Sequence, residues 1–176
     1  AGLQRDLGLE RLVVINDFTA LALALPTLTP DELHPIGGGS VAPDCAIAVL
    51  GPGTGLGVSG LIPSHGGWIA LQSEGGHVSF APFNEVEVSI LQFAWREYEH
   101  VSAERLASGR GLELIYRALS ERAGRADTAP LLAAEITSRA LNNECEVCLE
   151  AVDCFCAILG SVAGNVAMTL GALGGI

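Results

Sequence analysis

The sequence predicts an α/β domain, and two observations support that prediction. Apolar runs typical of strands come first along the chain, and amphipathic helical patterns dominate after residue 85. The run at 46–50 leads directly into a turn with four alternating glycines, Gly51-Pro52-Gly53-Thr54-Gly55-Leu56-Gly57. A backbone without side chains can bring its N–H groups close to an anion, so this turn is a candidate phosphate-binding element.

The first part of the chain is expected to consist of strands, turns and one short helix. In chain order we expect a buried strand at 11–15, a helix at 18–25 closed by Pro26, a surface connection at 27–43, a buried strand at 46–50, and a hairpin of strands 56–62 and 68–72 joined through 63–67. The glycine turn then lies between two strands. Gly55-Leu-Gly57-Val-Ser-Gly60 has the spacing of a dinucleotide-binding fingerprint, but that fingerprint requires a helix after the turn. A nicotinamide-type dinucleotide fold is therefore the weaker alternative, and a hairpin that merely needs glycines is another.

Helical patterns fill the rest of the chain. They cover 85–99, 102–106, 112–123, 130–141, and a last helix from near Asn142 to Leu170. The stretch 157–176 carries no charge and is formally long enough to span a bilayer. Its glycines and polar residues favour instead a buried helix, followed by a glycine turn toward a further core strand. Because the chain begins without Met and stops in apolar sequence, we expect it to be part of a longer polypeptide.

The charge balance excludes several classes of function. The 176 residues carry a net charge of −11, and all nine basic residues are Arg. Nucleic-acid binding needs clustered cations, and an anionic membrane surface is disfavoured for the same reason. Without Lys, the chain cannot carry the Gly-Lys of a P-loop. A phosphate site must then rely on backbone N–H groups, Arg or a metal ion.

Five cysteines are present, and four of them, Cys145, Cys148, Cys154 and Cys156, crowd one segment. An odd number with this spacing is a poor disulfide framework. Structural zinc is an alternative, but on a helix Cys154 would point away from the other three. The favoured interpretation is small buried apolar residues in a reducing compartment.

Three polar motifs are candidates for chemistry. Asn16-Asp17 follows the first expected strand, where it is either a helix cap or a catalytic pair. In Glu74-Gly75-Gly76-His77, the two glycines let a carboxylate and an imidazole converge on one point, unless the segment is only a polar turn. Glu104, taken alone, is expected to be a solvent-facing helix charge, and Ser108-Gly109 a helix end with a cap for the next helix.

Taken together and in this order, the motifs resemble the bacterial glucokinase family of the hexokinase–actin-like superfamily. The matching pieces are Ile15-Asn16-Asp17-Phe18-Thr19-Ala20, the glycine turn, Glu74-Gly75-Gly76-His77-Val78 with Phe80-Ala81-Pro82, and His100-Val101-Ser102-Ala103-Glu104-Arg105 with Ser108-Gly109. The similarity covers essentially the whole chain, and the ordered set is far more specific than any one motif.

The resemblance implies a cytoplasmic enzyme that phosphorylates glucose at its 6-hydroxyl, with ATP and Mg²⁺, in the first step of glycolysis. It implies that Asp17 is the general base, and that the sugar hydroxyls are bound by Asn16, Glu74, His77 and Glu104. It further implies that phosphate is bound by Gly51, Gly53, Thr54 and Gly55, with no metal ligand assigned to the protein. The implied fold is ribonuclease-H-like, of the actin-like ATPase type. In that fold, residues 1–26 would be the end of the small domain and the hinge, and 27–176 most of the large α/β domain with several helices, truncated at its C-terminus.

The sequence also departs from the family pattern. The family has a first phosphate loop of Asp-x-Gly-Gly-Thr type on an earlier hairpin and an adenosine-binding Gly-Gly stretch further on. Residues 1–176 include neither of them. We therefore expect an incomplete ATP site and an inactive protein if this chain stands alone. The expected partners are glucose and ATP, with no nucleic acid and no membrane, and with a possible homodimer. The alternative is a non-catalytic sugar-binding or regulatory module on the same fold.

Overall fold

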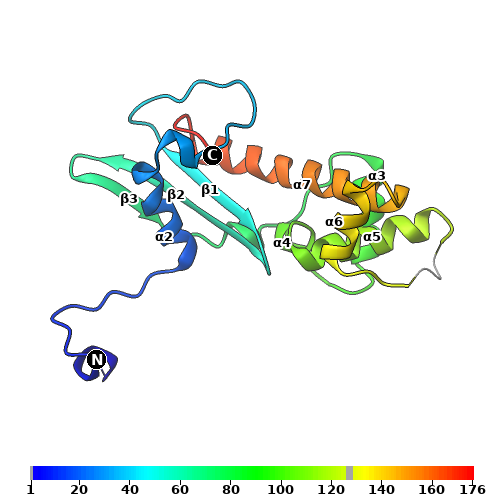
Figure 1. Cartoon of the computed structure of the whole chain (residues 1–176), viewed down its shortest axis with the longest axis horizontal. Coiled ribbons are helices and arrows are strands. Elements are labelled where there is room, and N and C mark those ends of the chain that lie inside the picture. Colours follow the sequence, from blue (N-terminus) through cyan, green and yellow to red (C-terminus); the bar gives the residue numbers. More distant parts are fainter. Residues whose placement is uncertain (1, 126–128) are drawn as a thin grey trace.

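The structure is a computed structural model that describes residues 2–125 and 129–176 (Figure 1). Its helices and strands are α1 (Gly2–Asp6), α2 (Asp17–Ala24), β1 (Ile47–Pro52), β2 (Leu56–Ser64), β3 (Gly67–Leu71), α3 (Glu85–Ala94), α4 (Ala103–Leu106), α5 (Gly109–Arg122), α6 (Ala133–Leu141) and α7 (Glu146–Leu170). Short 3₁₀ turns occupy Leu25–Thr27, Pro30–Glu32 and Gly75–His77. The sheet lies at one end of the molecule, α3–α6 lie at the other, and α7 runs between them. The α/β class, with strands before most of the helices, is confirmed.

The sheet has three antiparallel strands in the order β1-β2-β3. The glycine turn joins β1 to β2, and Gly51 pairs with Gly57 across the two strands. The β2–β3 hairpin closes where Ser64 pairs with Gly67, whose positive φ of 118° favours glycine. The expected hairpin is confirmed, and so is the placement of the glycine turn between two strands. A strand after Gly60 removes the helix that the dinucleotide alternative required.

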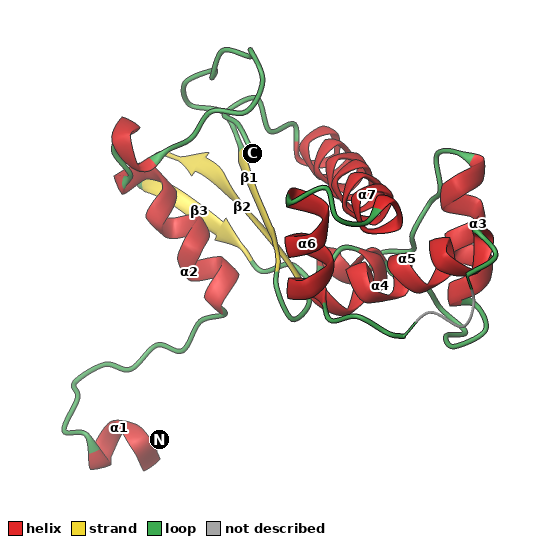
Figure 2. Ribbon diagram, turned by 45° about the vertical axis from the view of Figure 1, so that its right-hand side comes forward, coloured by secondary structure: helices red, strands yellow, loops and turns green. Residues whose placement is uncertain are grey.

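Helix α2 lies across one face of this sheet (Figure 2), and the last turn of α7 reaches the other face. A Cβ added at Gly57 would meet the ring of Phe18 in α2, whereas one added at Gly60 would meet Leu170 at the end of α7. Because side chains alternate between the faces of a strand, positions 57 and 60 face opposite sides. The candidate motifs on α2 are thereby held against one face, and the last turn of α7 against the other.

The chain end beyond α7 returns to the sheet, as expected. Gly171 ends the helix in the left-handed conformation, with φ 59°. The N–H of Gly174 donates to the carbonyl of Ala46 at 2.9 Å, and the N–H of Ala48 donates to the carbonyl of Gly175 at 3.0 Å. The last residues therefore run beside β1, although these hydrogen bonds do not define a strand.

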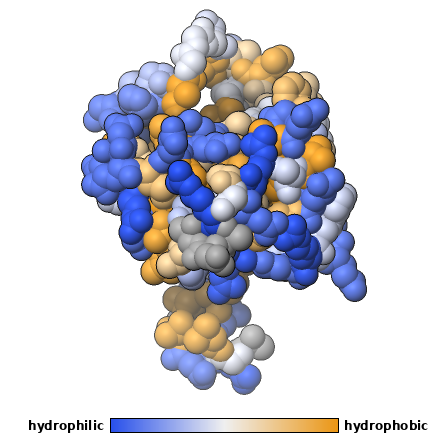
Figure 3. Space-filling model, turned by 90° about the vertical axis from the view of Figure 1, so that its right-hand side faces the viewer, coloured by the Kyte–Doolittle hydropathy of each residue, from blue (hydrophilic) through white to orange (hydrophobic). Residues whose placement is uncertain are grey.

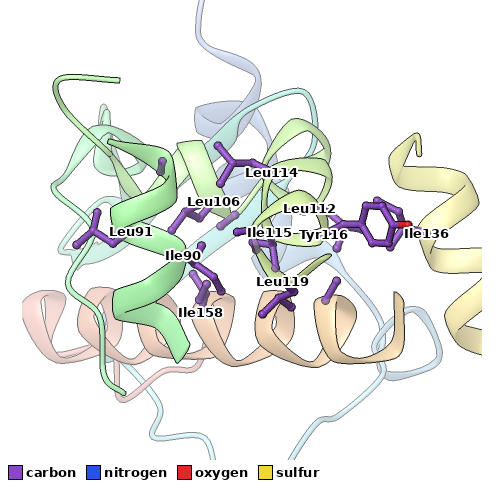
Figure 4. Close-up of a cluster of buried hydrophobic side chains, with 14 of the residues drawn as sticks. Ile90, Leu91, Leu106, Leu112, Leu114, Ile115, Tyr116, Leu119, Ile136 and Ile158 are labelled. Carbon is purple, nitrogen blue, oxygen red and sulfur yellow. The ribbon is translucent and has the colours of Figure 1, made fainter. Parts of the chain in front are cut away.

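The main hydrophobic core lies among the helices (Figure 4). Ile90 of α3, Leu106 of α4, Ile115 of α5 and Ile158 of α7 are all fully buried. Burying a side chain of this size contributes about 1.5–3 kcal/mol relative to leaving it exposed. The helical end therefore forms a stable base from which the sheet and its turns project.

The outer surface of the helical end is largely hydrophilic (Figure 3). Arg96 forms two hydrogen bonds of 2.8 Å with Glu121, and Arg117 pairs with Glu97. Both guanidinium groups also lie over the ring of Phe93, at 5.0 and 5.5 Å from its centroid. These contacts hold α5 against α3 and against the turn that follows α3.

The expected buried strand at 11–15 is wrong. These residues form an extended segment without a strand partner in the described part of the chain, and Val14 is 85% exposed. β-Branched residues favour an extended backbone, but a strand also needs a partner that lies elsewhere in the sequence. The apolar pattern therefore predicted the local conformation and not the pairing.

Two helix predictions also need correction. The helix expected over 85–99 ends at Ala94, because the N–H groups of Arg96 and Glu97 bond three residues back and tighten the chain into turns. The last helix does run to Leu170, but it is less buried than expected, with Met168 77% exposed. Among residues 2–125 and 129–176, α7 is the one helix with the length and hydropathy to cross a bilayer, a criterion that core helices also meet.

Candidate functional site

One pocket of about 380 Å³ gathers most of the predicted site residues. The predicted residues in its wall are Asn16, Asp17, Gly51, Gly53, Thr54, Gly55, Glu74 and Glu104. They come from the start of α2, the β1–β2 turn, the segment after β3, and α4. Segments far apart in sequence therefore meet at one edge of the sheet.

Asn16 and Asp17 are positioned by the start of α2. Asn16 is the N-cap, and its Oδ1 accepts hydrogen bonds from the N–H groups of Phe18 at 2.8 Å and Thr19 at 3.4 Å. Asp17 Oδ1 also accepts from the N–H of Phe18, at 2.9 Å. The cap and the catalytic-pair interpretations are therefore compatible, because the cap bonds use the Asn16 oxygen and leave its amide N–H groups as possible donors.

Phe18 is held on the bare backbone of the Gly51–Gly57 pair. A Cβ at Gly57 would lie 2.0 Å from two ring atoms of Phe18, and one at Gly51 would lie 3.0 Å away. The φ angles of Gly51, Gly53, Gly55 and Gly57 are not positive, so the two paired glycines are needed for close approach and not for backbone freedom. The ring fixes the start of α2 against the sheet, and hence the place of Asp17.

The tip of the glycine turn is closed by its own backbone and docked on α5. The N–H of Gly53 donates to the carbonyl of Gly55 at 2.7 Å, and the N–H of Gly109 donates to the carbonyl of Gly53 at 3.0 Å. Ser108 caps α5 by accepting from the N–H of Gly111 at 3.2 Å, which confirms the expected cap. The positive end of the α5 dipole therefore lies beside the turn, with Thr54 exposed at its tip.

The expectation that Glu104 is only a solvent-facing helix charge is wrong. Its Oε2 accepts a hydrogen bond from the N–H of Leu56 at 3.0 Å. A Cβ at Gly55 would lie 2.3 Å from the same oxygen, so Gly55 makes room for the carboxylate. Glu104 is half-buried against the turn, and its other oxygen remains a possible acceptor for a ligand.

Glu74 lines the pocket, whereas His77 stands next to Glu74 outside the described lining. The His77 Nε2 lies 3.7 Å from the Glu74 Oε2, and both side chains are exposed. The two glycines between them press against β2, since a Cβ at Gly76 would lie 2.1 Å from the carbonyl oxygen of Leu56. The two side chains therefore lie side by side, as the intervening glycines allow, but only Glu74 lines the pocket.

The pocket carries a negative charge. Asp17, Glu74 and Glu104 supply carboxylates, while no Arg or Lys is among the described residues of its wall. Carboxylates and an amide can accept and donate hydrogen bonds in fixed directions, which suits a polyhydroxylated ligand. Any phosphate must be met by backbone dipoles or by an added cation.

Ser73 and Phe18 shape the pocket, but the sequence reasoning gave neither of them a role in the site. Ser73 lines the pocket, and its Oγ accepts from the N–H of Gly75 at 3.0 Å, which shapes the turn that carries Glu74. Its place directly before the Glu-Gly-Gly-His motif was a usable signal. Phe18 was predicted to start a helix and belongs to one of the matching motif pieces, but its packing on the glycine pair could not be seen in the sequence.

Solved structures define the class to which this fold belongs. A structure described as glucokinase from an Antarctic psychrotroph superposes with a TM-score of 0.89 at 38% identity, over 99% of this chain and 54% of that one. A glucokinase from Balamuthia mandrillaris, in complex with glucose, gives a TM-score of 0.65 at 26% identity over 74% of this chain and 38% of that one. The fold is thus the expected ribonuclease-H-like fold of the actin-like class.

Sequence comparisons identify the family within that class. The family model described as Glucokinase matches residues 1–176. The glucokinase of Chromobacterium violaceum is 55% identical over 98% of this chain, and a bifunctional protein glk of Burkholderia pseudomallei is 56% identical over the same share. The chain belongs to the glucokinase family. It spans 49% of the first relative's length and 27% of the second's.

Proposed function

We propose that these residues form the sugar-binding and catalytic part of a glucokinase, which transfers a phosphoryl group from ATP to the 6-hydroxyl of glucose. One observation carries the proposal. Asp17, Glu74 and Glu104, which are remote from one another in the sequence, line one pocket together with the glycine turn. Family membership makes glucose the first sugar to test.

Asp17 is proposed as the general base. Phosphoryl transfer needs alignment of the two oxygens and stabilisation of charge, and little covalent help from the protein. The proton of the attacking hydroxyl moves to the Asp17 carboxylate while the sugar oxygen bonds to phosphorus. The hydrogen bond from the N–H of Phe18 holds one carboxylate oxygen in place and leaves the other free for this transfer.

The sugar is proposed to be held by Asn16, Glu74, His77 and Glu104 through their exposed donors and acceptors. Glu104 is oriented by the hydrogen bond that it accepts from the N–H of Leu56, whereas Glu74 and His77 stand on a turn with exposed side chains. A site that pairs each hydroxyl discriminates against analogues that lack one. We therefore expect Glu104 to contribute more to discrimination between sugars than His77.

Phosphate is proposed to bind at the tip of the glycine turn. Thr54 is exposed there, and the N-terminus of α5 adds a favourable dipole for an anion. The described residues contain no cluster of three or more His, Cys, Asp or Glu side chains that could hold a metal ion. Mg²⁺ often binds through one or two carboxylates plus substrate phosphates, where it neutralises charge on the transferring group, and this donor set fits that mode.

The same proposal divides the chain into the end of the small domain with the hinge at 1–26 and a large domain at 27–176. It also includes a cytoplasmic location and a possible homodimer. The segment before α2 fits a connection, because Val13 and Val14 are 62% and 85% exposed. Limited proteolysis of the full-length protein would test it. Glucose should protect the 11–15 segment from cleavage if domains close over the sugar there.

The experiment that tests the catalytic proposal compares Asp17→Asn with Asp6→Asn in the full-length protein. Loss of the base should lower kcat about 10²–10⁴-fold. Glucose binding by calorimetry should remain, and the Asp6 variant should behave as wild type. Full activity in the Asp17 variant would remove that residue from the role. Wild-type protein that binds glucose but never transfers phosphate would support a sugar-binding module instead.

A further inference from the structure

We propose that Cys145 and Cys148 form a redox-active dithiol, in which Cys145 reacts with a small-molecule disulfide and Cys148 resolves the product into an internal disulfide. The pair stands at the start of α7, among the helices and not on the pocket wall. The proposal is independent of sugar phosphorylation. It gives a chemical role to the cysteine motif that phosphoryl transfer does not use.

The geometry places the two thiols together. Cys145 is the N-cap of α7, and its Sγ accepts a hydrogen bond from the N–H of Cys148 at 3.4 Å. Residues at the cap and three positions later lie on the same side of a helix, so the sulfur atoms are neighbours. Cys145 is half-buried and reachable from solvent, whereas Cys148 is fully buried behind it. This is the order of an attacking thiol and a resolving thiol.

The surroundings divide the reactivity between the two sulfurs. Burial acts to raise the pKa of Cys145, but hydrogen bonds from Cys148 and from the N–H of Val147, with the charge of Arg139, leave it below its usual value. The pKa of Cys148 is raised by burial, by the hydrogen bond with Cys145, and by the negative charge of the Cys145 thiolate. Among the acidic groups nearby, Glu146 lies in the first turn of the helix, and the charge of Glu135 raises the pKa of Cys148 further, against the opposing effect of Arg139.

The remaining cysteines lack this arrangement. Cys156 is exposed on the body of α7, and Cys45 lies in the loop before β1. Burial raises the pKa of Cys154, and the nearby carboxylates of Glu150 and Glu87 raise it further. Thiolates are the reactive form of cysteine, and helix N-termini favour them, so Cys145 is the expected nucleophile among the five.

The reaction is ordinary thiol–disulfide exchange. The Cys145 thiolate attacks one sulfur of a small disulfide such as oxidised glutathione, forms a mixed disulfide, and releases one thiolate. Cys148 then loses its proton to solvent and attacks the Cys145 sulfur, which releases the second thiolate. Both protein thiols are oxidised, and one small disulfide is reduced to two thiols. Because Cys148 is buried, the second step needs a local opening of the first turn of α7.

The test uses the reduced full-length protein, treated with oxidised glutathione and mapped by peptide mass spectrometry. In the wild type, we expect an internal Cys145–Cys148 disulfide. In Cys148→Ser, glutathione should remain trapped on Cys145, because the resolving thiol is gone. In Cys145→Ser both products should be lost, while the matched control Cys156→Ser should form the internal disulfide as the wild type does.

A measurement on unmutated protein guards against misfolded variants. Alkylation with iodoacetamide at neutral pH should be about tenfold faster at Cys145 than at the more exposed Cys156, because thiolate content and not exposure should set the rate. Faster alkylation at Cys156 would overturn the proposal. So would glutathione that attaches to other cysteines and leaves the 145–148 pair reduced.

Discussion

The sheet end and the helical end of this molecule use their residues in opposite ways. At the helical end, large side chains such as Ile115 and Ile158 are fully buried, and ion pairs lie on the outer surface. At the sheet end, the candidate site residues Asp17 and Glu74 are exposed, and glycines are pressed against neighbouring atoms. The difference separates the part that supplies stability from the part that positions reactive groups.

That comparison teaches where a small change should matter. Removal of atoms is costly at the helical end, because a cavity is left in a packed core. Addition of atoms is costly at the sheet end, because the glycines there have no spare volume beside Phe18 and Glu104.

The largest effect on stability is expected from Ile115→Ala. Ile115 is fully buried in α5, so the change should lower the free energy of unfolding by about 2–5 kcal/mol. Urea unfolding of the full-length protein measures it. The exposed Ile69 on β3 offers a matched control, and Ile69→Ala should cost far less. Equal losses for the two variants would contradict the assignment of the main core to the helices.

The next effect is expected from Gly57→Ala. The new methyl group would overlap the ring of Phe18, so α2 must shift and carry Asp17 with it. We expect kcat to fall at least about tenfold, with a loss of stability of about 1–3 kcal/mol. Steady-state kinetics with glucose measures kcat, and urea unfolding measures the stability.

The matched control for that variant is Gly66→Ala, where no atom of the described residues lies within 4 Å of an added Cβ. The double variant Gly57→Ala/Phe18→Leu should recover part of the activity, because the smaller Leu side chain leaves room for the new methyl group. A merely destabilised sheet would not be rescued in this way. The absence of rescue would therefore show that Phe18 does not transmit the effect.

A moderate effect is expected from Glu104→Ala. The N–H of Leu56 loses its acceptor, and the proposed sugar contact is lost with it. KM for glucose should rise about tenfold with a smaller change in kcat, because a hydrogen bond to a charged group contributes about 1.5–3 kcal/mol. Glu104→Gln keeps an acceptor oxygen and should lie between this variant and wild type. An unchanged KM in the Ala variant would exclude Glu104 from glucose binding.

The smallest effect is expected at the surface pair Glu97–Arg117. The hydrogen bond from Arg117 lowers the pKa of Glu97 against the opposing effect of burial. A carboxylate with a lowered pKa in the folded state stabilises the protein above its unfolded pKa, and this stabilisation is lost as pH falls through the folded value. The Glu97→Gln variant should therefore differ from wild type by up to about 1 kcal/mol at neutral pH and converge with it in acid. A difference that persists at low pH would point to lost packing instead.

The local elements were predictable because their signals are local. The glycine turn between two apolar runs predicted β1 and β2, and Ser108 predicted the start of α5. The extended run at 11–15 was misassigned, because pairing depends on a partner that the local pattern does not describe. Likewise the apolar composition of α7 suggested burial along its whole length. The structure buries Ile158 but leaves Met168 77% exposed, because burial depends on which other elements pack against each turn.

For the candidate site, the sequence by itself determined the residue types and their order. Asn16-Asp17, the glycine turn, Glu74 to His77 and Glu104 are present as motifs with the right chemistry for a sugar and a phosphate. Only the tertiary structure decided that Asp17, Glu74 and Glu104 share one pocket, that Gly51 and Gly57 hold a phenyl ring, and that Cys145 caps a helix. A motif reports the chemistry of neighbouring residues in the sequence. Whether distant motifs meet in one pocket, and which side chains come into contact, depends on how distant segments pack together.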